Sequence, residues 1–85
     1  MRFVDSELDL HRQTVEEALP RLRDHLYCAF TSGMSSTCIN HGYGSRMLRQ
    51  AVHRELKHHS LVKSFRAGGY GEGGEGVTIV ELADH

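Results

Sequence analysis

The chain has 85 residues and a mass of 9.6 kDa, which suffices for one hydrophobic core and excludes two independent domains. A composition of 39% hydrophobic and 25% charged residues is typical of a folded soluble protein, and no apolar stretch approaches the roughly 18 residues of a membrane span. The first residues predict no export signal, and two cysteines are too few for a disulfide scaffold, so we expect a reducing, cytoplasmic setting.

The net charge of −1 conceals an uneven distribution. Between Arg46 and Arg66 the sequence holds six basic residues and the single acid Glu55. Such a segment can attract a polyanion although the total charge is close to zero, but it can equally coat a solvated helix face. Charge alone leaves both interpretations open.

The first half of the chain predicts a strand followed by a helix. Alternating apolar and polar residues indicate a strand over 7–11, which places Asp9 and His11 on the same face. A capping-box pattern and apolar residues at helical spacing then predict a helix over 15–30. Because Pro20 lies inside this pattern, we expect a kink or a distorted first turn rather than a break.

The second half predicts three strands and one helix. A short strand is expected over 37–40, a helix over 46–59 with a basic outer face, and a further strand over 61–67. A glycine-rich stretch, 68–76, separates these from the most apolar strand, 77–82, which is expected to lie in the centre of the sheet. The inner face of the second helix should carry Met47, Leu48, Ala51, Val52 and Leu56. The remaining core is expected to comprise Leu8, Leu10, Leu19, Leu22, Leu26, Ile39, Val62, Phe65, Val77, Ile79 and Val80.

This order of elements predicts a two-layer α/β sandwich with a four-stranded mixed sheet. The helical crossovers favour parallel strands, and the last strand returns antiparallel. One domain spans residues 1–85, with its core over about 7–82. Because parallel strands end at the same edge of a sheet, we expect Asp9 and His11 to converge with the loop 41–44, at the edge where such folds bind ligands. The amino terminus of the second helix, which suits a phosphate, opens there too.

Five segments resemble those of one known domain family. They are LDLH (8–11), TVEEAL (14–19), HGYGSRMLR (41–49), LVKSFR (61–66) and GEGGEGVTIVEL (71–82). In this order and at these intervals they resemble the small MutS-related, or Smr, domain, over nearly the whole chain. The resemblance implies two helices and a four-stranded sheet, with the last strand inserted between the second and the third, similar to the C-terminal domain of a translation initiation factor.

The resemblance also implies an endonuclease, a hydrolase that nicks DNA or cleaves RNA with little sequence specificity. Family members occur alone, at the C-terminal end of MutS-like ATPases or appended to other proteins. They act in MutS-linked repair and recombination or at collided ribosomes. The partners implied are DNA or RNA, the ribosome and a larger MutS-like protein, without a membrane. The alternatives are a non-catalytic adaptor that binds nucleic acid or a ribosomal surface, and a protein-interaction module of a larger ATPase.

The candidate site combines the Asp-x-His and His-Gly-x-Gly motifs. The expected catalytic residues are Asp9, His11 and His41, and the expected nucleic-acid or phosphate-binding residues are Gly42, Tyr43, Gly44, Ser45, Arg46 and Arg49. One histidine, with His11 the leading candidate, would act as general base and another as general acid, while Asp9 orients a histidine and backbone amides hold the phosphate. No metal ligands are assigned and no cofactor is certain; a divalent ion is compatible with attack of water on DNA, whereas the 2′-hydroxyl of RNA needs none. His41 could instead cap its turn.

Two arginines depart from the family pattern. Arg12 and Arg46 stand where the family usually has glycine, and arginine takes a positive φ only with strain, which puts the loop conformation in doubt. Four other histidines are expected to face solvent: His25, His53, His58 and His59.

Overall fold

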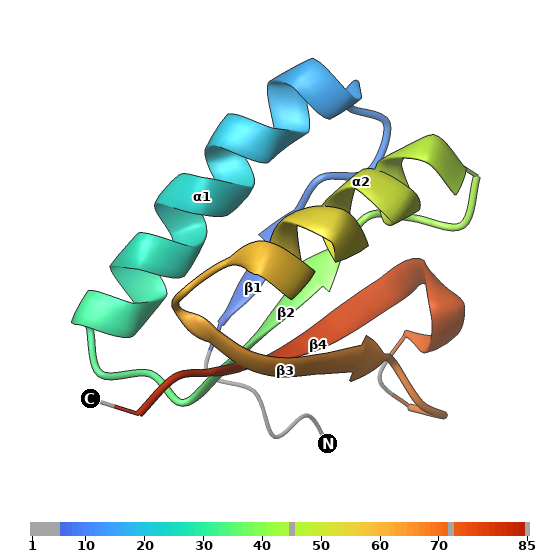
Figure 1. Cartoon of the computed structure of the whole chain (residues 1–85). Helices are drawn as coiled ribbons and strands as arrows, with labels where there is room; N and C mark the ends of the chain where they lie inside the picture. Colours follow the sequence, from blue (N-terminus) through green and yellow to red (C-terminus); the bar gives the residue numbers. More distant parts are fainter. Residues whose placement is uncertain (1–5, 45, 72, 85) are drawn as a thin grey trace.

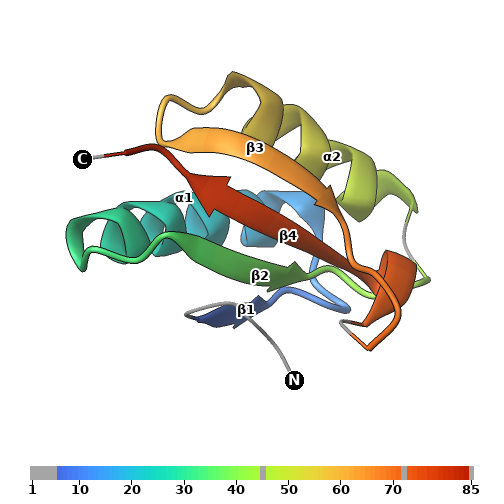
Figure 2. The same cartoon turned by 90° about the horizontal axis from the view of Figure 1, so that it is seen from below.

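The computed structural model describes residues 6–44, 46–71 and 73–84 as two helices packed on a four-stranded sheet (Figure 1). In chain order the elements are β1 (Glu7–Asp9), α1 (Val15–Thr31), β2 (Ser36–Asn40), α2 (Arg46–His58), β3 (Val62–Ala67), the short 3₁₀ helix η1 (Gly74–Gly76) and β4 (Val77–Leu82). Both helices cover the same face of the sheet, and the opposite face carries no helix (Figure 2). The predicted two-layer α/β sandwich is therefore confirmed.

The sheet order is β1-β2-β4-β3. β1 and β2 are parallel, and β4 runs antiparallel to both β2 and β3. The last strand thus lies in the centre of the sheet, as its continuous apolar sequence predicts, and between the second and the third strand, as the family resemblance implies. Within the part of the chain that the structure describes, neither helix has the length and apolarity needed to cross a membrane.

The start of α1 follows from its capping box. The Thr14 hydroxyl accepts the N–H of Glu17 at 3.1 Å, and the Glu17 carboxylate accepts the N–H of Thr14 at 2.9 Å. These bonds also lower the pKa of Glu17. Such a cap contributes about 1 kcal/mol to helix stability, and the helix then continues through Pro20 to Thr31 without a break.

The hydrophobic core lies between the helices and the sheet. Its buried members are Leu10, Ala18, Leu22, Leu26, Ala29, Ile39, Leu48, Val52, Leu56, Val80 and Leu82. Val77 and Ile79 are buried as expected, but they lie with Cys38 in a separate cluster and do not pack against the helices, because side chains alternate along β4. Met47 was also misplaced. It is 74% exposed, since it precedes by one position the stripe of Leu48, Val52 and Leu56.

The first strand is shorter than predicted. β1 ends at Asp9, and Leu10 still donates its N–H to the Asn40 carbonyl at 2.7 Å. A turn follows, closed by a hydrogen bond from the N–H of Gln13 to the Leu10 carbonyl at 3.2 Å. His11 therefore lies in this turn and not in the strand.

Candidate active site

The parallel strands β1 and β2 bring two turns together at one edge of the sheet. Asp9 pairs with Asn40 at the ends of the strands. Beyond them the turns touch, because a Cβ built on Gly42 would lie 3.1 Å from the Cβ of His11. A depression of about 310 Å³ opens here, lined by His11, Arg12, His41, Gly42, Tyr43 and Gly44. The sequence prediction that these segments converge is confirmed.

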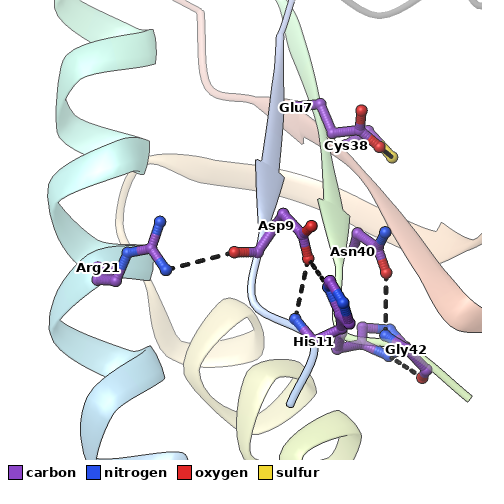
Figure 3. A network of polar contacts seen from close by, with 8 residues as sticks. Glu7, Asp9, His11, Arg21, Cys38, Asn40 and Gly42 are labelled. Atoms are coloured by element: carbon purple, nitrogen blue, oxygen red, sulfur yellow. Dashed lines mark hydrogen bonds and ion pairs between the residues drawn. The ribbon is translucent and has the colours of Figure 1, made fainter. Parts of the chain in front are cut away.

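Asp9 and His11 form an exposed hydrogen-bonded pair at this edge (Figure 3). The Asp9 carboxylate accepts the ring Nδ1–H of His11 and also its backbone N–H, the latter at 3.0 Å. The ring bond, followed by the backbone bond, lowers the pKa of Asp9, and the nearby charge of Arg21 contributes. Since an ionised carboxylate only accepts hydrogen bonds, Nδ1 of His11 carries the proton. Nε2 of the neutral ring is then left as an acceptor.

Arg21 of α1 supports this pair from the helix side. Its guanidinium donates to the backbone carbonyl of Asp9 at 3.4 Å (Figure 3). The sequence analysis did not identify Arg21. The helical periodicity of α1 was the signal that could have identified it. Arg21 lies one turn after Glu17 of the capping box, on the part of the helix near the end of β1.

His41 has a different environment from His11. Its side chain is buried, with 1% exposed. Nδ1 lies 3.1 Å from the carbonyl oxygen of Gly42 and must donate to it, so Nε2 of the neutral ring accepts the hydroxyl proton of Thr78 at 2.9 Å. Both ring nitrogens are thus used within the protein. These contacts fit the alternative expectation that His41 caps its own turn, and a role as general acid stays a prediction.

The hydrogen-bond chain continues to a second histidine. Because the Thr78 hydroxyl gives its only proton to His41, it accepts from Nε2–H of His53 at 2.8 Å. The rings of His41 and His53 meet edge-on at 5.9 Å between centroids, and His53 also packs on Phe65 at 5.3 Å. Burial lowers the pKa of both histidines, and the charge of Arg49 lowers each further. Each hydrogen bond in this series therefore donates in the same direction, from His53 to Thr78, from Thr78 to His41 and from His41 to the Gly42 carbonyl of the loop.

The expectation that the remaining histidines face solvent was wrong for His25, His53 and His59, which are all partly buried. His25 is half-buried, and its Nε2 lies 2.7 Å from the Thr37 hydroxyl. His59 is also partly buried, and its Nδ1 accepts the N–H of Leu61 at 3.1 Å. His58 is exposed as predicted. Threonines at inward positions of β2 and β4 are the sequence signal that was overlooked, because a buried hydroxyl requires a polar partner.

The loop after β2 is tied to the start of β4 through one carbonyl. The oxygen of Gly76 accepts the backbone N–H groups of both His41, at 3.1 Å, and Gly42, at 2.9 Å. The Gly42 N–H also lies 3.0 Å from the side-chain oxygen of Asn40 (Figure 3). The Gly42 amide, which we expected to hold a phosphate, is therefore occupied. In the described parts of the chain the N–H groups of Tyr43 and Gly44 have no hydrogen-bond partner; Ser45 lies outside the described residues.

Tyr43 fastens the same loop to the glycine-rich stretch. Its hydroxyl donates to the carbonyl of Gly73 at 2.5 Å, although the residue is 75% exposed. The ring lies so close to the chain that a Cβ on Gly76 would approach it to 2.8 Å. The glycine-rich stretch therefore packs against this ring and binds its hydroxyl. Stacking of Tyr43 on a base stays a prediction.

The two arginines in place of glycine behave differently. Arg46 is the first residue of α2, and among the described residues Arg12 is the one non-glycine with a positive φ, at 64°. The expected strain is thus present at Arg12, at a typical cost of about 1–3 kcal/mol, and absent at Arg46. Arg49 is half-buried near the buried His41 and the half-buried His53. Within the described ranges no three His, Cys, Asp or Glu side chains are grouped as a metal site.

We predict that Gly42→Ala destabilises the domain, whereas Gly44→Ala does not. Gly42 has a φ of +78° and contacts His11, while Gly44 has neither a positive φ nor an atom within 4 Å of a built Cβ. The expected difference in the free energy of unfolding is about 1–2 kcal/mol, measured by urea denaturation. Equal stability of the two variants would show that the contact between the turns contributes nothing to the free energy of unfolding.

We predict that Gly76→Ala is costly only when Tyr43 is present. The added methyl group would displace the Tyr43 ring and break its bond to Gly73. In a double-mutant cycle with Tyr43→Ala, the coupling free energy should be about 1 kcal/mol or more. Purely additive effects would contradict the packing described.

We predict that the stability of the domain decreases as the pH falls below about 6.5. The pKa values of His25, His41 and His53 are lowered by burial, so the unfolded chain binds more protons than the folded one in this range. Thermal unfolding should show a shallower pH dependence for His53→Gln, whose amide can still donate to Thr78. The matched variant His58→Gln, at an exposed position, should retain the wild-type dependence, and an identical slope for both variants would count against the buried chain.

The comparisons with known proteins agree with this geometry. The family model described as the Smr domain matches residues 8–83. Two similar relatives are proteins named endonuclease MutS2, from Caldicellulosiruptor saccharolyticus (49% identical over 98% of this chain) and Pelotomaculum thermopropionicum (48% identical over 96%). The chain spans about 10% of the length of each.

Two solved structures share the fold. The Smr domain of Thermus thermophilus MutS2 has a TM-score of 0.90 and 40% identity, and the alignment covers 94% of this chain and 100% of that one. YdaL, a stand-alone small MutS-related protein from Escherichia coli, has a TM-score of 0.86 and 27% identity, with 92% and 64% covered. The family match across nearly all residues and the identity to these relatives together establish that the chain belongs to the Smr domain family.

Proposed function

We propose that this domain is a phosphodiester endonuclease that nicks DNA or cleaves RNA with little sequence specificity. The observation that carries the proposal is the exposed Asp9–His11 pair at the rim of the depression, beside two backbone N–H groups that have no partner among the described residues. A base and a set of amide donors at one place are what attack on a phosphodiester requires.

In this proposal His11 is the general base. Its Nε2 takes the proton of the attacking hydroxyl, while Asp9 keeps Nδ1 protonated and stabilises the imidazolium that forms. On RNA the attacking group is the neighbouring 2′-hydroxyl and the product carries a 2′,3′-cyclic phosphate. On DNA the attacking group is water, and a divalent ion would assist.

The role of His41 is positioning. Because it is buried and bonded at both nitrogens, it holds the Gly42 carbonyl and thereby the loop, and the proton for the leaving oxygen comes from the His11 imidazolium or from solvent. The N–H groups of Tyr43 and Gly44 and the side chains of Arg46 and Arg49 are the proposed phosphate contacts. Ser45, outside the described residues, is retained as a candidate, whereas Gly42 shapes the loop.

The relatives support the endonuclease assignment by name. Proteins called endonuclease MutS2 match almost all of this chain, but the chain spans only about a tenth of their length. We therefore propose that the domain acts in the cytoplasm as part of a larger MutS-like protein, in control of repair and recombination or in ribosome-associated quality control.

A second function is favoured by one observation. Burial of His41 leaves a single exposed histidine at the site, which would suffice for binding without cleavage. In that case the domain is an adaptor that recognises nucleic acid or a ribosomal surface. The two functions differ in whether replacing His11 changes a covalent product or only an affinity.

We predict that His11→Ala reduces cleavage of supercoiled plasmid and of a structured RNA by about 10²- to 10⁴-fold while binding is retained. His58→Ala, which removes an exposed histidine near the end of α2, should leave the rate unchanged. Assays with EDTA and analysis of the RNA ends for a cyclic phosphate distinguish the two routes.

The adaptor function is favoured if the wild-type protein binds these substrates and cuts neither. Equal cleavage by His11→Ala and the wild type would exclude His11 as the base.

A further inference from the structure

Arg12 occupies a backbone conformation that its own side chain disfavours. It is the third residue of the turn that begins at Leu10 and is closed by the N–H of Gln13, and its φ is 64°. Turns with a positive φ at this position favour glycine or asparagine. An arginine here strains the backbone, and strain of this kind is concentrated at functional sites.

The surroundings of Arg12 supply no structural reason for an arginine. The residue is exposed, and its guanidinium forms no hydrogen bond or ion pair with any residue that the structure describes. Of the acids near it in the chain, Asp9 binds His11 and Glu17 binds Thr14, and Glu16 forms no ion pair with Arg12 in the described structure. The positive charge is therefore not neutralised within the described protein.

Arg12 does share the depression with the candidate base. It lines that depression together with His11, Tyr43 and Gly44, and the N–H groups of Tyr43 and Gly44 have no partner in the described parts. A cation and two amide donors among the residues that line one concave surface are suited to an anion. A guanidinium, with its planar pair of donors, matches a phosphate better than an ammonium group does.

We propose that Arg12 is a substrate-binding residue that holds a backbone phosphate of the nucleic acid next to the phosphodiester attacked at His11. The inference rests on the proposed function, because it names a further contact of the same site. Arg12 fixes the strand with respect to His11, and the strained turn is retained because it places the guanidinium at the rim of the depression.

The proposal predicts opposite effects of one substitution. Arg12→Gly relieves the backbone and removes the cation, so its melting temperature should rise while its affinity falls about tenfold. The dependence of the logarithm of affinity on the logarithm of salt concentration should become shallower by about one. Arg12→Lys, which keeps the charge, should retain the salt dependence with weaker binding.

The measurement is fluorescence anisotropy with a fluorescein-labelled RNA hairpin and a labelled DNA duplex. All variants are made in the His11→Ala background so that the probes stay intact. Lys57→Gln is the matched control, because it removes the same charge from an exposed position in the last turn of α2, away from the site. It should change the affinity by less than twofold, by the weak effect of a distant screened charge.

Each outcome separates this inference from the proposed function. If the wild-type protein binds neither probe and cuts neither substrate, the proposed function fails and this inference with it. If the protein binds but Arg12→Gly and Lys57→Gln have equal affinity and equal salt dependence, Arg12 is not a phosphate contact while the endonuclease proposal stands. A lower melting temperature for Arg12→Gly would overturn the argument from backbone strain.

Discussion

The shape of the site depends on one carbonyl group. The oxygen of Gly76 accepts two successive backbone N–H groups, those of His41 and Gly42, and so fixes the loop after β2 to the start of β4. This is geometrically available only because β4 lies between β2 and β3 and begins at the edge where β2 ends. Once both N–H groups are bound there, the next two, of Tyr43 and Gly44, are left without partners in the described protein. The availability of these two N–H groups, on which the proposed phosphate site depends, is thus a consequence of sheet order.

The same constraint gives the two motif histidines different roles. His41 is held between the Gly42 carbonyl and the Thr78 hydroxyl in a buried position, where desolvation lowers its pKa and keeps the ring neutral. A neutral ring can donate at one nitrogen and accept at the other, which is what this position requires. His11 is exposed and bonded to a carboxylate, which stabilises a proton on the ring when one is taken up. One side chain type therefore provides a buried support at one position and an exposed, carboxylate-bound ring at the other.

Local patterns were sufficient to predict the elements of the fold, but not every contact of the site. The capping box at Thr14 and the apolar sequence of β4 act within a few residues, so they predicted the start of α1 and the central strand correctly. The pairing of Thr78 with His53, and the use of the Gly42 amide by Gly76, depend on which strands are neighbours and on their register. The separate cluster that contains Ile79 also depends on the tertiary arrangement. Alternation along a strand shows which side chains share a face, but not which of the two faces the helices cover. The parallel pairing of β1 and β2 and the antiparallel return of β4 were nonlocal features that the order of elements made predictable.

The two turns that meet at the site show how steric exclusion differs from backbone strain. Both contain a left-handed residue, Gly42 at 78° and Arg12 at 64°. A side chain on Gly42 would crowd His11, so this position disfavours every residue but glycine for two reasons, the contact and the positive φ. Arg12 is exposed, so only its own backbone opposes a side chain there. The first position is thus determined by packing, whereas the second tolerates a side chain at a cost in stability. A residue kept at such a cost, at the rim of a depression and without a partner in the described protein, is best explained by a ligand that binds it.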